Sequence, residues 1–197
     1  METARENTQT PYVNEKADFG VSSMTSELRT VAMLRPMEAL RNADAKKWHY
    51  GSSFDPSKID SNYSTFAKIL NDMGVKILWM TSPNNRIADS IFTYDASFMT
   101  QNGAILLSPG KPLRKGEEKI HEVFYQKNNI PIIGKLSGSA LAEGGDMFWL
   151  DEKTLIIGIG FRTNKAGVEQ LKKILNPFDV RVLSFDLPFF KGPEACL

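Results

Sequence analysis

Apolar and polar positions recur in a fixed order through the middle of the chain. Residues 91–107 read as two strands joined by Gln-Asn-Gly, a sequence typical of a hairpin turn. Residues 113–128 then place apolar side chains at helical spacing, with Ile120 and Val123 on the same face. A short apolar run at 130–133 follows as a returning strand. The pattern therefore predicts a strand–strand–helix–strand unit.

The next stretch of sequence repeats this order. Residues 146–150 predict a strand, 151–153 a turn, and the run Thr-Leu-Ile-Ile-Gly-Ile-Gly a second strand. A helix at 164–175 and a strand at 179–183 complete the unit. The two units match at landmarks 51, 51 and 50 positions apart, namely Asp95 with Asp146, Ile105 with Ile156, and Ile130 with Val180. A period of this length indicates a repeat architecture.

A shorter, imperfect unit precedes these two. Residues 27–34 predict a strand, residues 61–73 a helix that ends at Gly74, and residues 75–80 a returning strand. The last stretch, 185–197, resembles the start of a fourth unit, so the array is expected to be open at this end. Units of this size cannot bury their own apolar faces and are expected to pack around a shared centre.

The composition indicates one globular domain behind a polar tail. Residues 1–22 lack the apolar core of a signal peptide and predict a flexible tail, with the domain at 23–197. The chain has 197 residues, 42% of them hydrophobic and 24% charged, as is ordinary for a soluble protein. A net charge of +1 favours neither nucleic acid nor an anionic membrane as a partner, and no apolar run could span a bilayer. The single cysteine excludes an internal disulfide and indicates a reducing, cytoplasmic compartment.

Charged residues lie at the ends of the predicted strands. Asp95 ends Phe-Thr-Tyr-Asp, Glu143 and Asp146 flank two glycines, and Arg162 lies just before a predicted helix. A guanidinium is planar and cationic, and a carboxylate is the natural partner for its paired N–H donors. These residues therefore indicate a pocket for a guanidinium-like cation. The competing interpretation is structural, because glycine and aspartate dominate turns, and Asp146 is expected to have such a role.

Several segments together resemble a known family. FTYDAS, SPGKPLRKGEE, LAEGGDMFW and GFRTNKAG, with the terminal LPFFKGPEACL, resemble the guanidino-group-modifying enzymes, most closely the dimethylarginine dimethylaminohydrolase-like branch. Arginine deiminases and amidinotransferases are the related branches. The resemblance implies an α/β propeller (pentein) of five ββαβ modules around a pseudo-fivefold axis, with the site at the centre. About three modules and a stub of a fourth would then be present.

The resemblance implies a role for five residues. Asp95 would hold the substrate guanidinium, Glu143 would hydrogen-bond a catalytic histidine, and Arg162 would bind the substrate's α-carboxylate. Asp89 and Arg114 correspond to substrate-contacting or supporting groups. The implied activity is C–N hydrolysis of a dimethylarginine-like derivative, in which a cysteine thiolate attacks the guanidinium carbon and water hydrolyses the covalent thiouronium. It releases an amine and a citrulline-type product and requires no metal or cofactor.

The sequence departs from the family pattern at the catalytic histidine and cysteine. In the family the histidine belongs to a His-Leu-x-Ser element directly after a segment like Gly-Pro-Glu-Ala-Cys-Leu, where this chain reaches Leu197. The family nucleophile lies in a later module, so Cys196 does not correspond to it. Neither His49 nor His121 matches the histidine, and His121 falls within a predicted helix. The 197-residue chain is therefore expected to be an incomplete and inactive part of an enzyme.

Other functions were weighed against this one. A dinucleotide-binding fingerprint after Thr-Leu-Ile-Ile-Gly-Ile-Gly would require a third glycine at position 163, which is threonine. The unmatched nucleophile leaves open a non-catalytic member that binds guanidino ligands or a partner protein, and an amidinotransferase would share the same core site. Two histidines far apart argue against a metal site. The sequence is also compatible with a homodimer.

Overall fold

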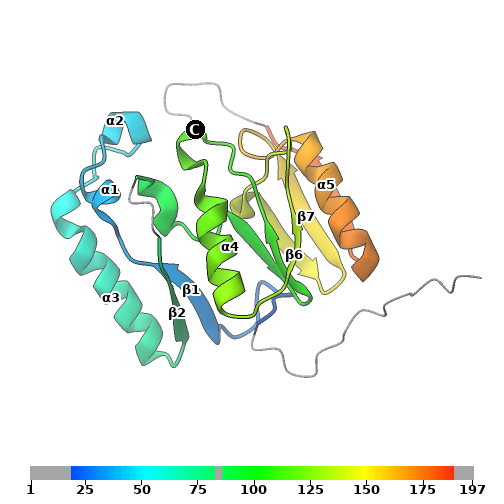
Figure 1. The fold of residues 1–197 in the computed structure, drawn as a ribbon, viewed down its shortest axis with the longest axis horizontal. Helices are drawn as coiled ribbons and strands as arrows, with labels where there is room; N and C mark the ends of the chain where they lie inside the picture. The colour runs from blue at the N-terminus through cyan, green and yellow to red at the C-terminus, as the bar shows by residue number, and fades with distance from the viewer. Residues whose placement is uncertain (1–18, 83–85, 189–197) are drawn as a thin grey trace, which may run out of the picture.

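The computed structural model describes residues 19–82 and 86–188, which form a mixed α/β fold (Figure 1). The strands are β1 Thr30–Leu34, β2 Lys76–Met80, β3 Ser97–Thr100, β4 Gly103–Leu106, β5 Ile132–Lys135, β6 Met147–Asp151, β7 Thr154–Ile159 and β8 Arg181–Asp186. The α-helices are α1 Glu38–Arg41, α2 Ala45–Trp48, α3 Ile59–Asp72, α4 Glu117–Lys127 and α5 Lys165–Leu175. Short 3-10 helices are η1 Pro56–Lys58, η2 Ala88–Ile91, η3 Pro112–Arg114, η4 Gly144–Asp146 and η5 Asn176–Phe178. Most of the predicted tail, and the segment 189–197 with Cys196, lie outside the described residues.

Two three-stranded sheets share one topology. β3 pairs with β4 antiparallel, and β4 pairs with β5 parallel across α4; β6, β7 and β8 are arranged in the same way around α5. The shorter unit upstream is a two-stranded parallel sheet of β1 and β2, connected through α3. This is the order of elements that the sequence pattern predicts. The three sheets are separate in the described residues, so closure around a fivefold axis stays a prediction.

Local sequence explains where the elements start. Gly103 begins β4 with φ +136°, and a Cβ there would lie 2.4 Å from the carbonyl oxygen of Pro131. Only glycine fits this close approach between β4 and the chain entering β5. Asn164 is the N-cap of α5, where its side-chain oxygen accepts a hydrogen bond from the N–H of Gly167 at 2.8 Å.

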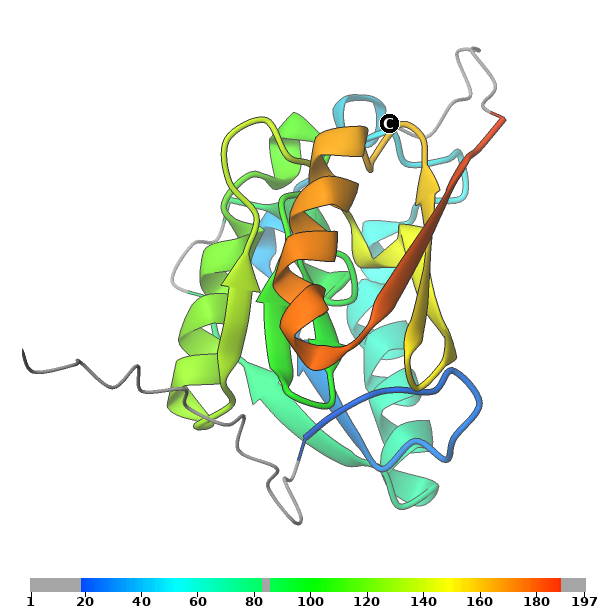
Figure 2. The same ribbon diagram turned by 90° about the vertical axis from the view of Figure 1, so that its right-hand side faces the viewer.

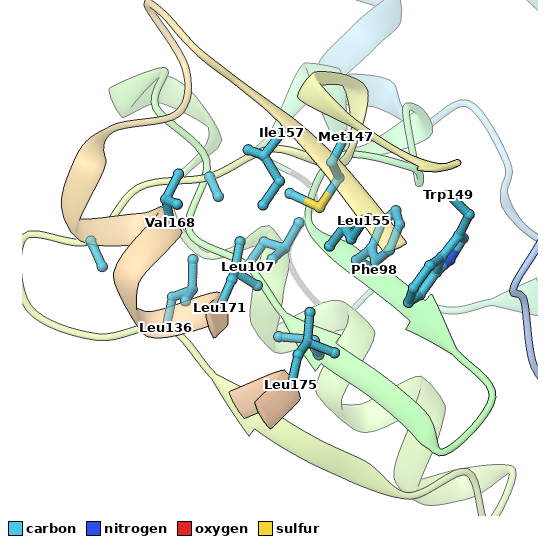
Figure 3. Packing of buried hydrophobic residues seen from close by; sticks show 13 residues of the cluster. Phe98, Leu107, Leu136, Met147, Trp149, Leu155, Ile157, Val168, Leu171 and Leu175 are labelled. Atoms are coloured by element: carbon cyan, nitrogen blue, oxygen red, sulfur yellow. The ribbon is translucent and has the colours of Figure 1, made fainter. Parts of the chain in front are cut away.

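Helix α5 lies between the two three-stranded sheets (Figure 2). Its buried stripe is Val168, Leu171 and Leu175, spaced so that all three fall on one helical face. Figure 3 shows this stripe in the cluster that includes Leu107 after the second sheet and Trp149 of the third. A single helix thus provides core for two sheets.

Strand β4 is buried on both faces, which explains its uninterrupted apolar sequence. Ile105 faces the cluster around α5, whereas Ala104 and Leu106 belong to the cluster of α4, with Ile120 and Phe124. That second cluster also reaches the sheet of β1 and β2, so α4 lies between the first and second sheets (Figure 1). α3 covers the other face of β1 and β2.

The structure differs from two predicted details. The predicted hairpin starts at residue 91, but Ile91 ends η2 and β3 begins only at Ser97. Val123, predicted on the buried face of α4, is 49% exposed, and the buried face carries Glu117 and His121 instead. Helical spacing alone could not identify this face, because its polar side chains have buried partners from other elements.

The outer face of the third sheet is apolar and exposed. Along β6, Met147 and Trp149 point into the core, and Phe148 and Leu150 point out with exposures of 44% and 60%. Phe185 of β8 adds another exposed ring, at 56%. The outer face of an antiparallel hairpin is usually polar where it meets water. The apolar side chains on this face are instead typical of a sheet face that packs against another layer of structure. Within the described residues no helix is long and apolar enough to cross a membrane.

Candidate functional site

Two of the carboxylates singled out in the sequence, Asp95 and Glu143, lie against the side chain of Arg114. This residue ends η3, and its Nη1 donates to Asp95 Oδ2 at 2.6 Å. The same nitrogen lies 3.8 Å from Glu143 Oε2. Asp95 precedes β3 and Glu143 immediately precedes η4, so two repeated units each contribute one carboxylate. The structure therefore brings Asp95, Glu143 and Arg114 together.

The Glu-Gly-Gly-Asp segment folds directly against Asp95. The N–H of Gly145 donates to Asp95 Oδ1 at 3.1 Å, and the N–H of Gly144 donates to the backbone oxygen of Asp95 at 3.2 Å. A Cβ on Gly144 would lie 1.9 Å from the carbonyl oxygen of Tyr94. The glycine is needed because two backbone segments touch here.

Glu143 is held from three sides. Arg162 Nη1 donates to its two carboxylate oxygens at 3.0 and 2.8 Å, and the N–H of Gly110 donates to Oε1 at 2.8 Å. Its own N–H donates to Thr163 Oγ1 at 3.2 Å, and that hydroxyl donates in turn to Asp146 Oδ2 at 2.6 Å. Burial raises the pKa of Asp146, and the Thr163 hydrogen bond opposes this effect. Asp146 and Thr163 thus fix the segment that carries Glu143.

Glu117, which the sequence interpretation did not select, is the main partner of Arg114. The guanidinium donates to its carboxylate through Nε at 2.9 and 3.1 Å and through Nη2 at 2.7 Å. The pair is buried, with Glu117 1% and Arg114 2% exposed. Burial, opposed by Arg114, raises the pKa of Glu117 to about 7. In a continuous helix their i, i+3 spacing would place the two side chains side by side. Here Arg114 ends η3, Glu117 begins α4, and Gly116 between them has φ +106°, so the contact depends on the turn and not on helical spacing.

Asp89 has its own cation. Lys111 Nζ donates to Asp89 Oδ2 at 2.7 Å, and the Tyr50 hydroxyl donates to Oδ1 at 2.6 Å. The ammonium also donates to the carbonyl oxygen of Trp48 at 2.7 Å and lies 5.0 Å from the centre of the Trp48 ring. Burial and the Asp89 carboxylate raise the pKa of Tyr50. Sequence reasoning missed Lys111 and Tyr50. They are 22 and 39 positions from Asp89 along the chain, and no local pattern links residues that far apart.

The two histidines lie away from Glu143. His121 Nδ1 is 2.8 Å from Ser97 Oγ, which is 2.6 Å from the hydroxyl of Tyr125, and all three residues are buried. Burial, with a smaller effect from Arg114, lowers the pKa of His121 to about 3. His49 is exposed and ends α2. No histidine in the described part of the chain contacts Glu143, in agreement with the departure noted in the sequence.

The low pKa of His121 predicts a loss of stability in acid. Since its ordinary pKa is 6.5, unfolding takes up a proton once the pH falls below that value. The free energy of unfolding should therefore fall by up to about 1.4 kcal/mol per pH unit between about pH 6.5 and pH 3. Urea unfolding of the wild type and His121→Gln across this range measures the effect. His49→Gln is the control, and the same slope in His121→Gln as in the wild type would contradict the assignment.

Exposure separates the charged residues into two groups. The side chains of Asp89, Arg114, Glu117 and Glu143 are between 1% and 7% exposed. Those of Asp95 and Arg162 are 22% and 19% exposed. Asp95 and Arg162 are therefore the members that a small molecule can reach from solvent. Within the described residues, no three or more histidine, cysteine, aspartate or glutamate side chains are grouped to hold a metal ion.

Comparison with known proteins agrees with this chemistry. The family model described as arginine deiminase matches residues 85–182. The N(G),N(G)-dimethylarginine dimethylaminohydrolase of Pseudomonas aeruginosa is 28% identical over 121 residues, which cover 61% of this chain and 47% of the relative. An uncharacterised protein of Caenorhabditis elegans is 26% identical over 169 residues, covering 86% and 60%. The chain thus spans at most 60% of the length of these two relatives.

Solved structures show the same fold. A dimethylarginine dimethylaminohydrolase adduct with 4-chloro-2-hydroxymethylpyridine matches with a TM-score of 0.69 and 23% identity, over 82% of this chain and 61% of that one. An amidinotransferase from Microseira wollei matches with a TM-score of 0.65 and 15% identity, over 90% and 64%. The arginine deiminase match and the dimethylarginine dimethylaminohydrolase relatives together support the guanidino-group-modifying enzyme superfamily as the family of this chain.

Proposed function

We propose that the described residues form the guanidinium-binding half of an enzyme that hydrolyses the guanidino group of an arginine derivative. The observation that carries this proposal is the side chain of Arg114, a guanidinium that the cluster already binds through Asp95 and Glu117. A carboxylate arrangement that satisfies one planar guanidinium has the donor–acceptor geometry for another. The exposed edge of Asp95 is the place where a second one can reach it.

The charge of the cluster supports a cationic ligand. Its carboxylates outnumber its cations by five to three: Asp89, Asp95, Glu117, Glu143 and Asp146 against Lys111, Arg114 and Arg162. A cation that enters therefore compensates negative charge in a partly buried site, where electrostatic interactions are strong. Citrulline-type products carry a neutral ureido group and would bind less tightly than a guanidinium.

We assign the individual roles as follows. Asp95 binds the substrate guanidinium, and Arg162, which is partly exposed, binds the α-carboxylate. Glu143 orients a histidine supplied by the whole protein. Its carboxylate, which can accept about four hydrogen bonds, receives three contacts of 3.0 Å or less here and so has room for one more. The buried pairs of Asp89 with Lys111 and of Arg114 with Glu117 support these groups from behind.

The proposed reaction is the one that the family resemblance implies. A cysteine thiolate bonds to the guanidinium carbon, the C–N bond to the leaving nitrogen breaks, and the histidine gives a proton to the departing amine. Water then adds to the carbon, and the thiolate leaves, which yields a citrulline-type product. Transfer of the amidino group to an amine in place of water is the alternative reaction, favoured by the fold shared with an amidinotransferase.

The proposed architecture of the whole protein is the five-module α/β propeller. The identical pairing in the second and third sheets supports it, as does the bare apolar face of β6 and β8. Helix α4 of the second unit covers one face of the first sheet, and helix α5 of the third unit covers one face of the second sheet. By the same arrangement, a helix of a further module would cover the exposed face of β6 and β8.

Ligand binding by the chain tests the proposed site. We expect methylguanidinium to bind, and Asp95→Asn to weaken binding at least about tenfold, because a charge-assisted hydrogen bond contributes about 1.5–3 kcal/mol. Nuclear magnetic resonance titration of the purified chain measures both affinities. Asp179→Asn, an exposed aspartate with φ +58°, makes the same charge change elsewhere and is the matched control. Methylurea that binds as tightly as methylguanidinium, or an Asp95→Asn variant with unchanged affinity, would refute the site.

A separate expectation concerns turnover. The 197-residue chain should release no amine from dimethylarginine, arginine or agmatine, since neither histidine contacts Glu143 and His121 is neutral and buried. Assays for dimethylamine release from dimethylarginine, and for ammonia release from arginine and agmatine, measure this. Turnover that disappears in Cys196→Ser would instead identify Cys196 as the nucleophile.

A further inference from the structure

A cavity of about 560 Å³ lies beside the charged cluster, and none of its lining residues takes part in the proposed reaction. It opens between the loop after α2, helix α3 and the end of η2. Its volume is within the range of about 300–1,000 Å³ that small-molecule sites occupy. Five aromatic side chains line it, those of Tyr50, Phe54, Tyr63, Phe66 and Phe92, together with the aliphatic Leu40, Ile59 and Ile91.

The lining is chemically the opposite of the charged cluster. Among the described residues that form it there is no aspartate, glutamate, lysine or arginine. Apart from the two tyrosines, the polar side chains that line it are His49, Ser53 and Asn62. A cation placed here would lose hydration without gaining a carboxylate partner, so the cavity disfavours the cations that the charged cluster favours.

The aromatic walls are held in place before any ligand arrives. The Tyr63 hydroxyl donates to the carbonyl oxygen of Leu34 at 2.6 Å, and the Tyr50 hydroxyl is fixed on Asp89. The rings of Tyr50 and Phe54 pack with centroids 4.5 Å apart. Rings fixed in this way lose little freedom when a ligand binds, which favours affinity. Phe92 is 49% exposed, so apolar surface remains to be covered.

Two residues belong to both the cavity and the charged cluster. Tyr50 lines the cavity and binds Asp89, and Phe92 lines it while its carbonyl oxygen accepts from Arg114 Nη2 at 3.2 Å. The cavity and the guanidinium site therefore adjoin. From this juxtaposition we propose that the cavity binds an uncharged apolar group of one or two rings. The group is either a separate neutral ligand or an apolar substituent of a guanidino compound, and the second source rests on the proposed function.

Filling the cavity tests the proposal. Asn62 is exposed on α3 and lines the cavity, so Asn62→Trp should occupy the space without disturbing the core. Ser64→Trp places the same side chain on the same helix, where it is exposed and outside the lining, and is the matched control. Ligand-observed magnetic resonance with indole should show binding to the wild type and to Ser64→Trp, and at least about tenfold weaker binding to Asn62→Trp.

Guanidino probes distinguish the two sources. If the apolar group is a substituent, phenethylguanidine should bind more tightly than methylguanidine, and Asn62→Trp should abolish only this gain. If it is a separate ligand, indole binding should depend on Asn62 and not on Asp95, with no gain for phenethylguanidine. The proposal is overturned if neither indole nor phenethylguanidine responds to Asn62→Trp. The proposed guanidinium site is tested by a separate measurement: it is refuted if methylguanidine binds the Asp95→Asn variant as tightly as the wild type.

Discussion

Replacing Arg114 with methionine should destabilise the protein by about 3–5 kcal/mol, the usual cost of removing one partner from a buried ion pair. The side chain is 2% exposed and contacts the carboxylates of Asp95 and Glu117 within 3.1 Å, with Glu143 at 3.8 Å. Methionine keeps the length of the side chain but leaves the carboxylate of Glu117, which is 1% exposed, without its cation. Urea unfolding followed by circular dichroism measures the change.

Two further variants separate the electrostatic cost from a packing defect. In the double variant Arg114→Met with Glu117→Gln, a neutral amide replaces the buried carboxylate of residue 117. A large part of the lost free energy of unfolding should therefore return. Arg41→Met removes an arginine that pairs with Asp60 at the surface, where side chains are 40% and 60% exposed, and should change little. If the double variant is no more stable than Arg114→Met, packing and not charge accounts for the loss.

Replacing Gly167 with alanine should destabilise the protein, although alanine in a helix normally gains about 1 kcal/mol over glycine. A Cβ at this position in α5 would lie 2.1 Å from the carbonyl oxygen of Leu141. That carbonyl accepts from the N–H of Asn164 at 3.0 Å, and the N–H of Leu141 donates to the Asn164 side chain at 3.1 Å. The start of α5 would have to move away from Leu141, and we expect a net loss of about 1–3 kcal/mol.

The position of Leu141 gives this substitution a functional effect as well. Leu141 is two residues before Glu143, so displacement of the contact should also weaken methylguanidinium binding. Gly160→Ala is the control, because the nearest atom to its Cβ would be Leu187 Cδ1 at an ordinary 3.8 Å. Thermal unfolding and the binding titration give the two measurements. A Gly167→Ala variant as stable as Gly160→Ala would show that α5 can shift freely, contrary to the packing described.

The sequence predicted the order of elements because each element carries its own local signal. The run Gly-Ala-Ile-Leu in β4 is apolar without a break and proves to be buried on both faces. Asn164 provides an N-cap just where α5 begins. These signals come from the backbone and from adjacent side chains, so they survive in any tertiary context.

The rest of the site depended on contacts between distant segments. Asp95 and Glu143 were selected through family motifs, but the pairing of Arg162 with Glu143, and not with solvent, is a tertiary contact across 19 residues. Glu117 and Lys111 were overlooked because a charged residue normally predicts a solvent-exposed position. Both are buried here, and only the folded chain shows their ionic partners, Arg114 for Glu117 and Asp89 for Lys111. These partners offset the cost of removing the two charges from water.

The placement of α4 and α5 between sheets has a consequence for how such a chain could have grown by duplication. The segment that recurs in the sequence is strand–strand–helix–strand, but the assembly that holds a core is sheet–helix–sheet, which joins parts of two neighbouring copies. The helix of a copy therefore needs one surface that fits the sheet of the preceding copy and one that fits its own sheet. Substitutions on the buried faces of a helix such as α5 must be compatible with the packing of two sheets. The ends of the repeated segment in the sequence therefore differ from the ends of the unit that holds a core in the folded protein.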